Sequence, residues 1–206
     1  MRGKKKVSDP IFVAGPVGQL EAQIDEIPEA KFVAVLCHPH SQYGGSMHDG
    51  VLQIMVAALN GLGVSTVRFN FRSVGQSEGE FDHGEGEIQD VLAMSAWAEK
   101  RWPGLPLILG GYSFGAAMSL IAASRIEEKV RKLILIAPPI QMIESDGAVS
   151  IDSCVIVGGR DTIVSASAAA QYFKPDQLKL LPQADHFFID SRVELTEYIH
   201  GFMNGA

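Results

Sequence analysis

Ser113 is the residue of this chain whose surroundings point most directly to chemistry. It is the centre of a Gly-Tyr-Ser-Phe-Gly pentad (residues 111–115), between an apolar run at 105–109 and a run of helical composition at 116–123. A G-x-S-x-G turn between a strand and a helix is sharp, so the serine hydroxyl projects alone beyond the sheet. The N–H of the next residue, Phe114, then lies at a helix N-terminus, where it can donate to an oxyanion. The pattern predicts a serine nucleophile.

A serine hydroxyl needs a base, and two later segments supply a base and a partner acid. Asp161 follows an apolar run at 153–157, which predicts a buried strand, and His186 follows a second such run at 178–181. An imidazole can take the serine proton, while a buried carboxylate fixes its tautomer and stabilises its cation. We therefore predict that Ser113, Asp161 and His186 are the catalytic residues.

Each of these residues also has an ordinary structural interpretation. Ser113 can be an ordinary helix N-cap, Asp161 can be an N-cap for the helix predicted at 164–173 or a turn former, and His186 can be a loop residue without a role. Asp185 is a rival acid, although an acid next to the histidine in sequence usually points elsewhere. The order serine, acid, histidine along the chain favours the catalytic interpretation.

A second oxyanion donor is expected in the loop that follows the apolar run at 32–37. Pro39 has no N–H, so the backbone N–H of His40 is the predicted donor and that of Ser41 is the second choice. Together with Phe114, such a donor would hold the negative oxygen of a tetrahedral intermediate.

His38, His40 and Asp49 raise the question of a metal site. An H-x-H pair can bind zinc, but no Cys or carboxylate cluster stands nearby in the sequence to complete a ligand set. A metal-dependent hydrolase is a rival interpretation, and we predict neither a metal nor an organic cofactor. Arg72, in the loop after an apolar run at 64–70, can steer an anionic group or pair with a buried carboxylate.

The rest of the chain alternates between strand-like and helix-like runs. Two extended runs around Gly-Pro-Val-Gly (residues 15–18) predict an N-terminal β-hairpin. Apolar strands separated by helices predict an α/β fold, with one mostly parallel central sheet and helices on both faces. We expect one domain over residues 1–206, with residues 1–9 flexible. The predicted strands are 11–14, 20–24, 32–37, 64–70, 107–109, 132–136, 153–157 and 178–181, and the predicted helices 47–59, 85–101, 116–123, 164–173 and 189–203.

Composition narrows the range of partners. A net charge of −7 and a pI near 5.3 disfavour nucleic acid, because phosphate binding needs clustered Lys and Arg. No apolar run reaches the length of a signal-peptide core or a transmembrane helix, so we expect no membrane association. Cys37 and Cys154 each fall in a predicted buried strand, which favours reduced thiols and a cytoplasmic location.

Five sequence blocks together resemble the serine α/β-hydrolase superfamily, and more narrowly its small lidless bacterial esterases near the dienelactone hydrolases. Two blocks are similar to the subgroup's H-P-H-P-x-Y-G-G-x-M and N-F-R-G-V-G-x-S-x-G patterns, and three to its elbow, acid and histidine motifs. Ser41 replaces a proline of the pattern and Ser73 a glycine. The nucleophile is Ser rather than Cys, so a dienelactone substrate is not implied. The blocks are HPHSQYGGSM (38–47), FNFRSVGQSEG (69–79), GYSFG (111–115), GGRD (158–161) and ADHFF (184–188).

The resemblance implies an esterase, and one short connection implies an open site. Many members insert a cap where this chain has only the 16 residues from Ala137 to Asp152, too few for a helical cap domain. We expect cleavage of small or short-acyl carboxylic esters or thioesters through an acyl-enzyme. Peptidase, acyltransferase and perhydrolase activities and a non-catalytic binding module are the alternatives. An exposed edge strand allows a homodimer. The expected acyl pocket consists of Tyr43, Phe114, Ile140, Met142 and Val164.

Overall fold

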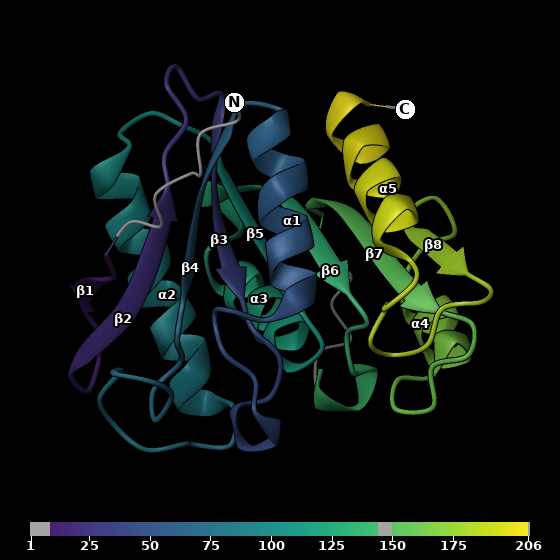
Figure 1. The fold of residues 1–206 in the computed structure, drawn as a ribbon, viewed down its shortest axis with the longest axis horizontal. Helices are drawn as coiled ribbons and strands as arrows, with labels where there is room; N and C mark the ends of the chain where they lie inside the picture. The colour runs from purple at the N-terminus through teal and green to yellow at the C-terminus, as the bar shows by residue number, and fades with distance from the viewer. Residues whose placement is uncertain (1–8, 144–149, 206) are drawn as a thin grey trace, which may run out of the picture.

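The computed structural model describes residues 9–143 and 150–205, and eight strands in this part of the chain form one sheet (Figure 1). The expected flexibility of residues 1–9 falls, except for Asp9, outside the described residues. The order is β1-β2-β4-β3-β5-β6-β7-β8; β2 pairs antiparallel with β1 and β4, and the remaining neighbours are parallel. This confirms the N-terminal hairpin and the mostly parallel sheet. The strands are β1 (Ile11–Ala14), β2 (Gln19–Asp25), β3 (Phe32–Cys37), β4 (Val64–Phe69), β5 (Leu107–Tyr112), β6 (Val130–Ile136), β7 (Asp152–Gly158) and β8 (Leu178–Leu181).

Helices cover both faces of the sheet, as the alternating pattern predicts. Two of them, α1 (Gly50–Gly61) and α5 (Arg192–Asn204), pack side by side on the face nearer the viewer in Figure 1. The opposite face carries α2 (Glu85–Arg101), α3 (Phe114–Arg125) and α4 (Ala166–Tyr172). The sheet is therefore the middle of three layers.

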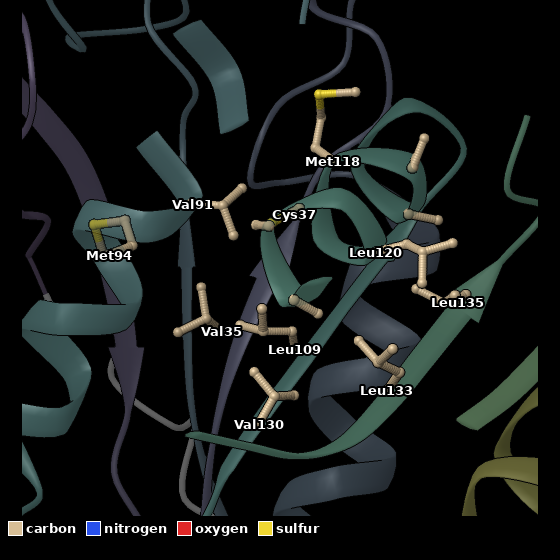
Figure 2. Close-up of a cluster of buried hydrophobic side chains, with 14 of the residues drawn as sticks. Val35, Cys37, Val91, Met94, Leu109, Met118, Leu120, Val130, Leu133 and Leu135 are labelled. Carbon is tan, nitrogen blue, oxygen red and sulfur yellow. The ribbon is translucent and has the colours of Figure 1, made fainter. Parts of the chain in front are cut away.

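Coverage on both faces explains why the strands are apolar throughout instead of alternating with polar residues. In β3, Val33 and Val35 belong to the cluster under α2 and α3, whereas Ala34 and Leu36 face α1. Removing one such side chain fully from water contributes about 1.5–3 kcal/mol. Figure 2 shows part of the first cluster, where strand residues meet α2 and α3: Val35, Cys37, Val91, Met94, Leu109, Met118, Leu120, Val130, Leu133 and Leu135.

The two cysteines are buried free thiols, as predicted. Burial raises the pKa of both Cys37 and Cys154 to about 12, so each thiol stays protonated and packs as a small apolar group.

Helix starts differ from the sequence prediction where a polar side chain caps the helix. We predicted a helix from Met47, but Asp49 accepts hydrogen bonds from the N–H groups of Val51 and Leu52, and α1 begins at Gly50. Ser165 likewise caps α4, so that helix starts at Ala166 rather than at 164. In both cases the cap outweighs the apolar periodicity that extends beyond it.

The loops after β3, β5, β7 and β8 leave the same edge of the sheet, because these strands run parallel. Residues 137–151 join β6 to β7, and the described part of this connection holds one short 3₁₀ helix, η3 (Ile140–Met142). Within residues 9–143 and 150–205, we find no helix with the length and apolar character required to cross a membrane.

Candidate active site

Ser113 occupies a one-residue turn between β5 and α3. β5 ends at Tyr112 and α3 begins at Phe114, and Ser113 has φ 53° and ψ −122°. A positive φ on a non-glycine residue costs about 1–3 kcal/mol and persists only when the surrounding structure holds it. Here the Ser113 N–H donates to the carbonyl of Ile136 on β6, at 2.8 Å. The serine is therefore lifted out of the strand and fixed at the edge of the sheet.

The two glycines of the pentad are needed because backbone packs against backbone at the turn. A Cβ at Gly115 would lie 2.3 Å from the carbonyl oxygen of Cys37 and 2.4 Å from that of His38. A Cβ at Gly111 would lie 2.5 Å from the carbonyl of Gly115. The missing side chains let the first turn of α3 lie directly beside the loop that follows β3.

The structure brings Ser113, His186 and Asp161 into one hydrogen-bonded chain. His186 Nε2 is 3.1 Å from Ser113 Oγ, and His186 Nδ1 is 2.7 Å from Asp161 Oδ2. A carboxylate can only accept, so Nδ1 carries the hydrogen and the lone pair of Nε2 faces the serine. The Asp161 side chain is fully buried and that of His186 is 8% exposed. This arrangement can transfer the serine proton to the imidazole.

Asp161 also makes the turn that its structural interpretation suggested. Its Oδ1 accepts the N–H groups of Ile163 and Val164, both at 2.8 Å, while Oδ2 contacts His186. The two interpretations of Asp161 are therefore compatible, because each uses a different oxygen of one carboxylate.

Tyr112 and Asp185 hold the loop that carries His186. The Tyr112 hydroxyl donates to the backbone carbonyl of His186 at 2.8 Å. Asp185 accepts the N–H groups of Phe187 and Phe188, both at 3.0 Å, and its side chain makes no hydrogen bond to the imidazole. The rival acid thus closes its own turn, and the anchoring role of Tyr112 is one that the sequence analysis missed.

His38 braces the loop after β3. Its Nδ1–H donates to the Pro39 carbonyl at 2.6 Å, and its Nε2 accepts the Phe71 N–H at 3.0 Å. Burial lowers the pKa of His38 to about 4, so the ring is neutral at pH 7. Because both ring nitrogens are used, His38 has no lone pair for a metal. The described residues contain no group of three or more His, Cys, Asp or Glu side chains that could hold one.

His40 lies beside the first residue of α3. Its ring centroid is 4.8 Å from that of Phe114, and its Nδ1 accepts the Gln42 N–H at 3.3 Å. Phe114 begins α3, so its N–H has no acceptor within the helix. The backbone N–H groups of His40 and Ser41 donate to no acceptor in the described part of the chain. The N–H groups of Phe114 and His40, the two predicted oxyanion donors, are therefore available to donate. The same holds for the N–H of Ser41, the second choice.

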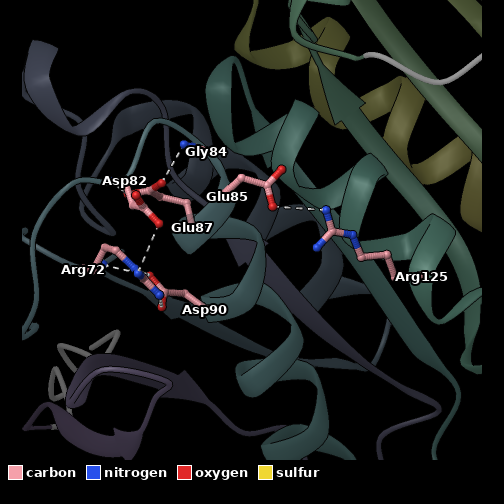
Figure 3. Close-up of polar contacts among 7 residues, drawn as sticks. All are labelled: Arg72, Asp82, Gly84, Glu85, Glu87, Asp90 and Arg125. Atoms are coloured by element: carbon pink, nitrogen blue, oxygen red, sulfur yellow. Dashed lines mark hydrogen bonds and ion pairs between the residues drawn. The ribbon is translucent and has the colours of Figure 1, made fainter.

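Arg72 is directed away from the site and into the fold. It makes a bidentate contact with Asp90 of α2, Nε to Oδ2 at 3.0 Å and a terminal nitrogen to Oδ1 at 2.8 Å, and its N–H also bonds Oδ2 (Figure 3). Both side chains are buried. Of the two interpretations offered for Arg72, the structure supports the buried ion pair.

An open cleft of about 580 Å³ lies above Ser113. Tyr43, Phe114 and Met142 line it as predicted, but Ile140 and Val164 do not. Ile140 packs against the buried core, and Val164 is 1% exposed. The remaining lining residues not yet placed in the site are Gly44, Gly45, Asp49, Pro139, Gln141, Ile163 and Phe187.

The turn at Asp161 explains why the cleft is lined by Ile163 and not by Val164. The carboxylate holds both N–H groups, which turns the Val164 side chain into the core and leaves Ile163 56% exposed. Phe187, next to the predicted base, is 59% exposed at the cleft. Phe187 directly follows His186 and Ile163 lies two residues after Asp161, but no sequence signal separates Ile163 from Val164.

Comparison with known proteins agrees with this geometry. A family model described as serine aminopeptidase, S33, matches residues 28–146. The solved structure of an α/β serine hydrolase homologue from Coxiella burnetii has a TM-score of 0.88 and 33% identity, covering 99% of this chain and 100% of that one. An α/β serine hydrolase without a lid, from Xanthomonas campestris, has a TM-score of 0.85 and 36% identity, covering 98% and 96%. An uncharacterized protein of Rickettsia prowazekii is 31% identical over 212 residues, covering 94% of this chain and 87% of that protein.

The similarity extends over the segments that build the site. The family match includes the loop after β3 and the pentad at 111–115, and the two solved structures also cover the acid and histidine loops. The lidless neighbour agrees with the short connection between β6 and β7. The chain is thus a member of the serine aminopeptidase S33 family, within the α/β serine hydrolases.

Proposed function

We propose that this hydrolase cleaves small or short-acyl carboxylic esters or thioesters through an acyl-enzyme on Ser113. The observation that carries the proposal is the hydrogen-bonded chain from Ser113 through His186 to Asp161, at 3.1 Å and 2.7 Å, at the floor of an open cleft. A buried carboxylate, an oriented imidazole and an exposed hydroxyl form the combination that acyl transfer requires.

In the first half-reaction, Ser113 Oγ bonds to the acyl carbon while its proton passes to His186 Nε2. The N–H groups of Phe114 and His40 stabilise the oxyanion, each with an effect of about 10²–10³ in rate. His186 then gives the proton to the leaving alcohol or thiol, and the acyl–oxygen or acyl–sulfur bond breaks. Water repeats the attack, releases the acid and restores the serine.

The expected preference for short acyl chains rests on the shape of the cleft. Among its described apolar residues, Ile163 is 56% exposed and Phe187 is 59% exposed, so this part of the cleft is open to solvent. A short chain can bury most of its length there, whereas each further methylene stays in contact with water and adds little affinity.

Hydrolysis of p-nitrophenyl esters from acetate to laurate, by wild type and Ser113→Ala in parallel, tests this function. We expect rates that are highest on short chains and that fall by at least about 10³-fold in the variant. Equal rates in the two proteins would refute the nucleophile assignment. If no ester is cleaved, a fluorophosphonate probe separates a narrow substrate range, in which Ser113 labels, from a non-catalytic module, in which it does not.

A peptidase is the second candidate, because the matching family is described as serine aminopeptidase. The same three side chains can cleave an amide when His186 protonates the leaving amine. Amino-acid p-nitroanilides assayed beside the esters discriminate between the two. A kcat/KM on an anilide that equals or exceeds that on the best ester would favour the peptidase.

A further inference from the structure

The charges around the cleft are unevenly distributed. Among the described residues that line it, Asp49 is the one with a formal negative charge, and they include neither Lys nor Arg. Asp161 is fully buried behind His186 and does not line the cleft. In the described part of the cleft, a substrate therefore meets a carboxylate and no Lys or Arg side chain.

Asp49 is held rigidly with one oxygen unused. Its Oδ1 accepts the N–H groups of Val51 at 2.8 Å and Leu52 at 3.3 Å, which fixes the side chain on the first turn of α1. Its Oδ2 makes no hydrogen bond to the described residues. Helix α1 is anchored by buried residues such as Leu52 and Met55, which fixes the backbone position of its N-cap residue Asp49.

Asp49 and His186 line the same cleft. Burial raises the pKa of Asp49, and the hydrogen bonds from the N–H groups of Val51, Leu52 and Gly50 and the charge of His186 offset only part of that shift. In the proposed reaction, His186 hands its proton to the leaving alcohol. Because His186 and Asp49 line one cleft, the alcohol part of an ester lies in the same cleft as the carboxylate of Asp49.

We propose that Asp49 is a specificity-determining residue that selects esters by the charge of their alcohol part, cationic over neutral over anionic. The proposal rests on the ester hydrolysis proposed above. Opposite charges attract and like charges repel more strongly in a partly buried cleft than in bulk water, so the full difference between a cation and an anion reaches about tenfold or more in kcat/KM.

Three acetate esters of similar size test the charge order: acetylcholine, 3,3-dimethylbutyl acetate and 2-sulfoethyl acetate. They carry a positive, a neutral and a negative group two carbons from the ester oxygen. Wild type and Asp49→Asn are compared by pH-stat titration of the acid released. Asn caps helices as well as Asp does, so the variant keeps α1 while it removes the charge; a thermal unfolding curve verifies the fold.

We expect wild type to prefer the cationic over the anionic ester by about tenfold or more, and this ratio to fall by at least about threefold in Asp49→Asn. Raising the salt concentration should weaken the wild-type preference. Asp176→Asn is the control, because it removes the same charge from an exposed turn that does not line the cleft. Its charge is screened by solvent, so the ratio should change by less than about twofold.

The outcomes separate the two proposals. An unchanged ratio in Asp49→Asn, or a wild type that prefers the anionic ester, overturns the role of Asp49 while ester hydrolysis stands. If wild type cleaves none of the three esters yet Ser113 labels with fluorophosphonate, the inferred alcohol class is wrong. Failure of both hydrolysis and labelling overturns the proposed function itself.

Discussion

The two sides of the cleft are built in opposite ways. One side, the braced wall, consists of residues 39–49 and rests on the loop at 70–79. The other, the apolar wall, consists of Pro139, Gln141, Met142, Ile163 and Phe187. The braced wall is tied to the fold by buried polar groups. Apart from buried Pro139, the residues of the apolar wall are half-exposed or exposed, and its described residues 139–143 make no side-chain hydrogen bond to another element.

The bonds behind the braced wall form a continuous network. Asn70 accepts the N–H of Met47 at 2.8 Å and donates to buried Glu21 at 2.8 Å, and Glu21 accepts the N–H of Gln76 at 2.8 Å. His38 joins the same two loops through Phe71. The wall that holds the proposed oxyanion donor is thus fixed by several buried hydrogen bonds, whereas the opposite wall has no such network in the described residues. Stabilisation of a developing charge needs fixed dipoles, and apolar contact does not.

Breaking the ion pair beneath the braced wall should give the largest effect on stability. Arg72→Met leaves the fully buried carboxylate of Asp90 without its partner, which costs about 3–5 kcal/mol. Arg125→Met is the matched control: Arg125 pairs with Glu85 at 3.5 Å on the surface (Figure 3), where such pairs contribute about 0–1 kcal/mol. Urea unfolding of both variants measures the difference. Similar losses in the two would show that the buried pair does not brace the wall.

The pH dependence of stability gives a smaller effect on the same wall. The pKa of His38 in the folded protein is about 4, below the 6.5 of a free histidine, because burial disfavours the cation. As pH falls below 6.5 the unfolded chain binds the proton first, so folding stability is lost until pH reaches about 4. The loss from this residue is about 2–3 kcal/mol at pH 4.5.

His38→Gln isolates this contribution, since the amide oxygen can still accept the Phe71 N–H but does not titrate. We compare the fall in unfolding free energy from pH 7 to pH 4.5 in the two proteins. We expect this fall to be about 2–3 kcal/mol smaller in His38→Gln than in wild type. His48→Gln, at an exposed histidine of the braced wall, should follow wild type. Equal losses in wild type and His38→Gln would mean that His38 is not buried as a neutral ring.

The sequence predicted the framework of the site because the framework follows from chain order. Ser113, Asp161 and His186 each lie in the segment that follows a strand, and parallel strands bring their carboxyl ends to one edge. Strand β3 and helix α2 were predicted with their observed bounds, since apolar runs and charged helix ends are local signals.

The side-chain lining of the cleft could not be predicted in the same way. Whether Ile163 or Val164 faces the substrate depends on which backbone groups Asp161 holds, and that is decided by its tertiary contact with His186. The bond from Tyr112 to the His186 carbonyl joins residues 74 positions apart. No periodicity reports contacts of this kind, so the sequence places the chemistry better than it places the specificity.

The apolar wall should show the smallest change in stability together with a change in substrate use. Ile163→Ala removes a side chain that is 56% exposed and keeps the backbone bond to Asp161, so the free energy of unfolding should change by less than about 0.5 kcal/mol. If a bound acyl or alcohol chain lies against Ile163, the lost apolar contact raises KM by about two- to fivefold and leaves kcat nearly unchanged. Steady-state kinetics on butyrate and hexanoate esters, with urea unfolding in parallel, measure both quantities.

A loss of kcat without a change in KM would place Ile163 with the catalytic turn rather than with the substrate. A loss of more than about 1 kcal/mol in stability would show that the apolar wall, too, is part of the fold's support, and the contrast between the two walls would then disappear.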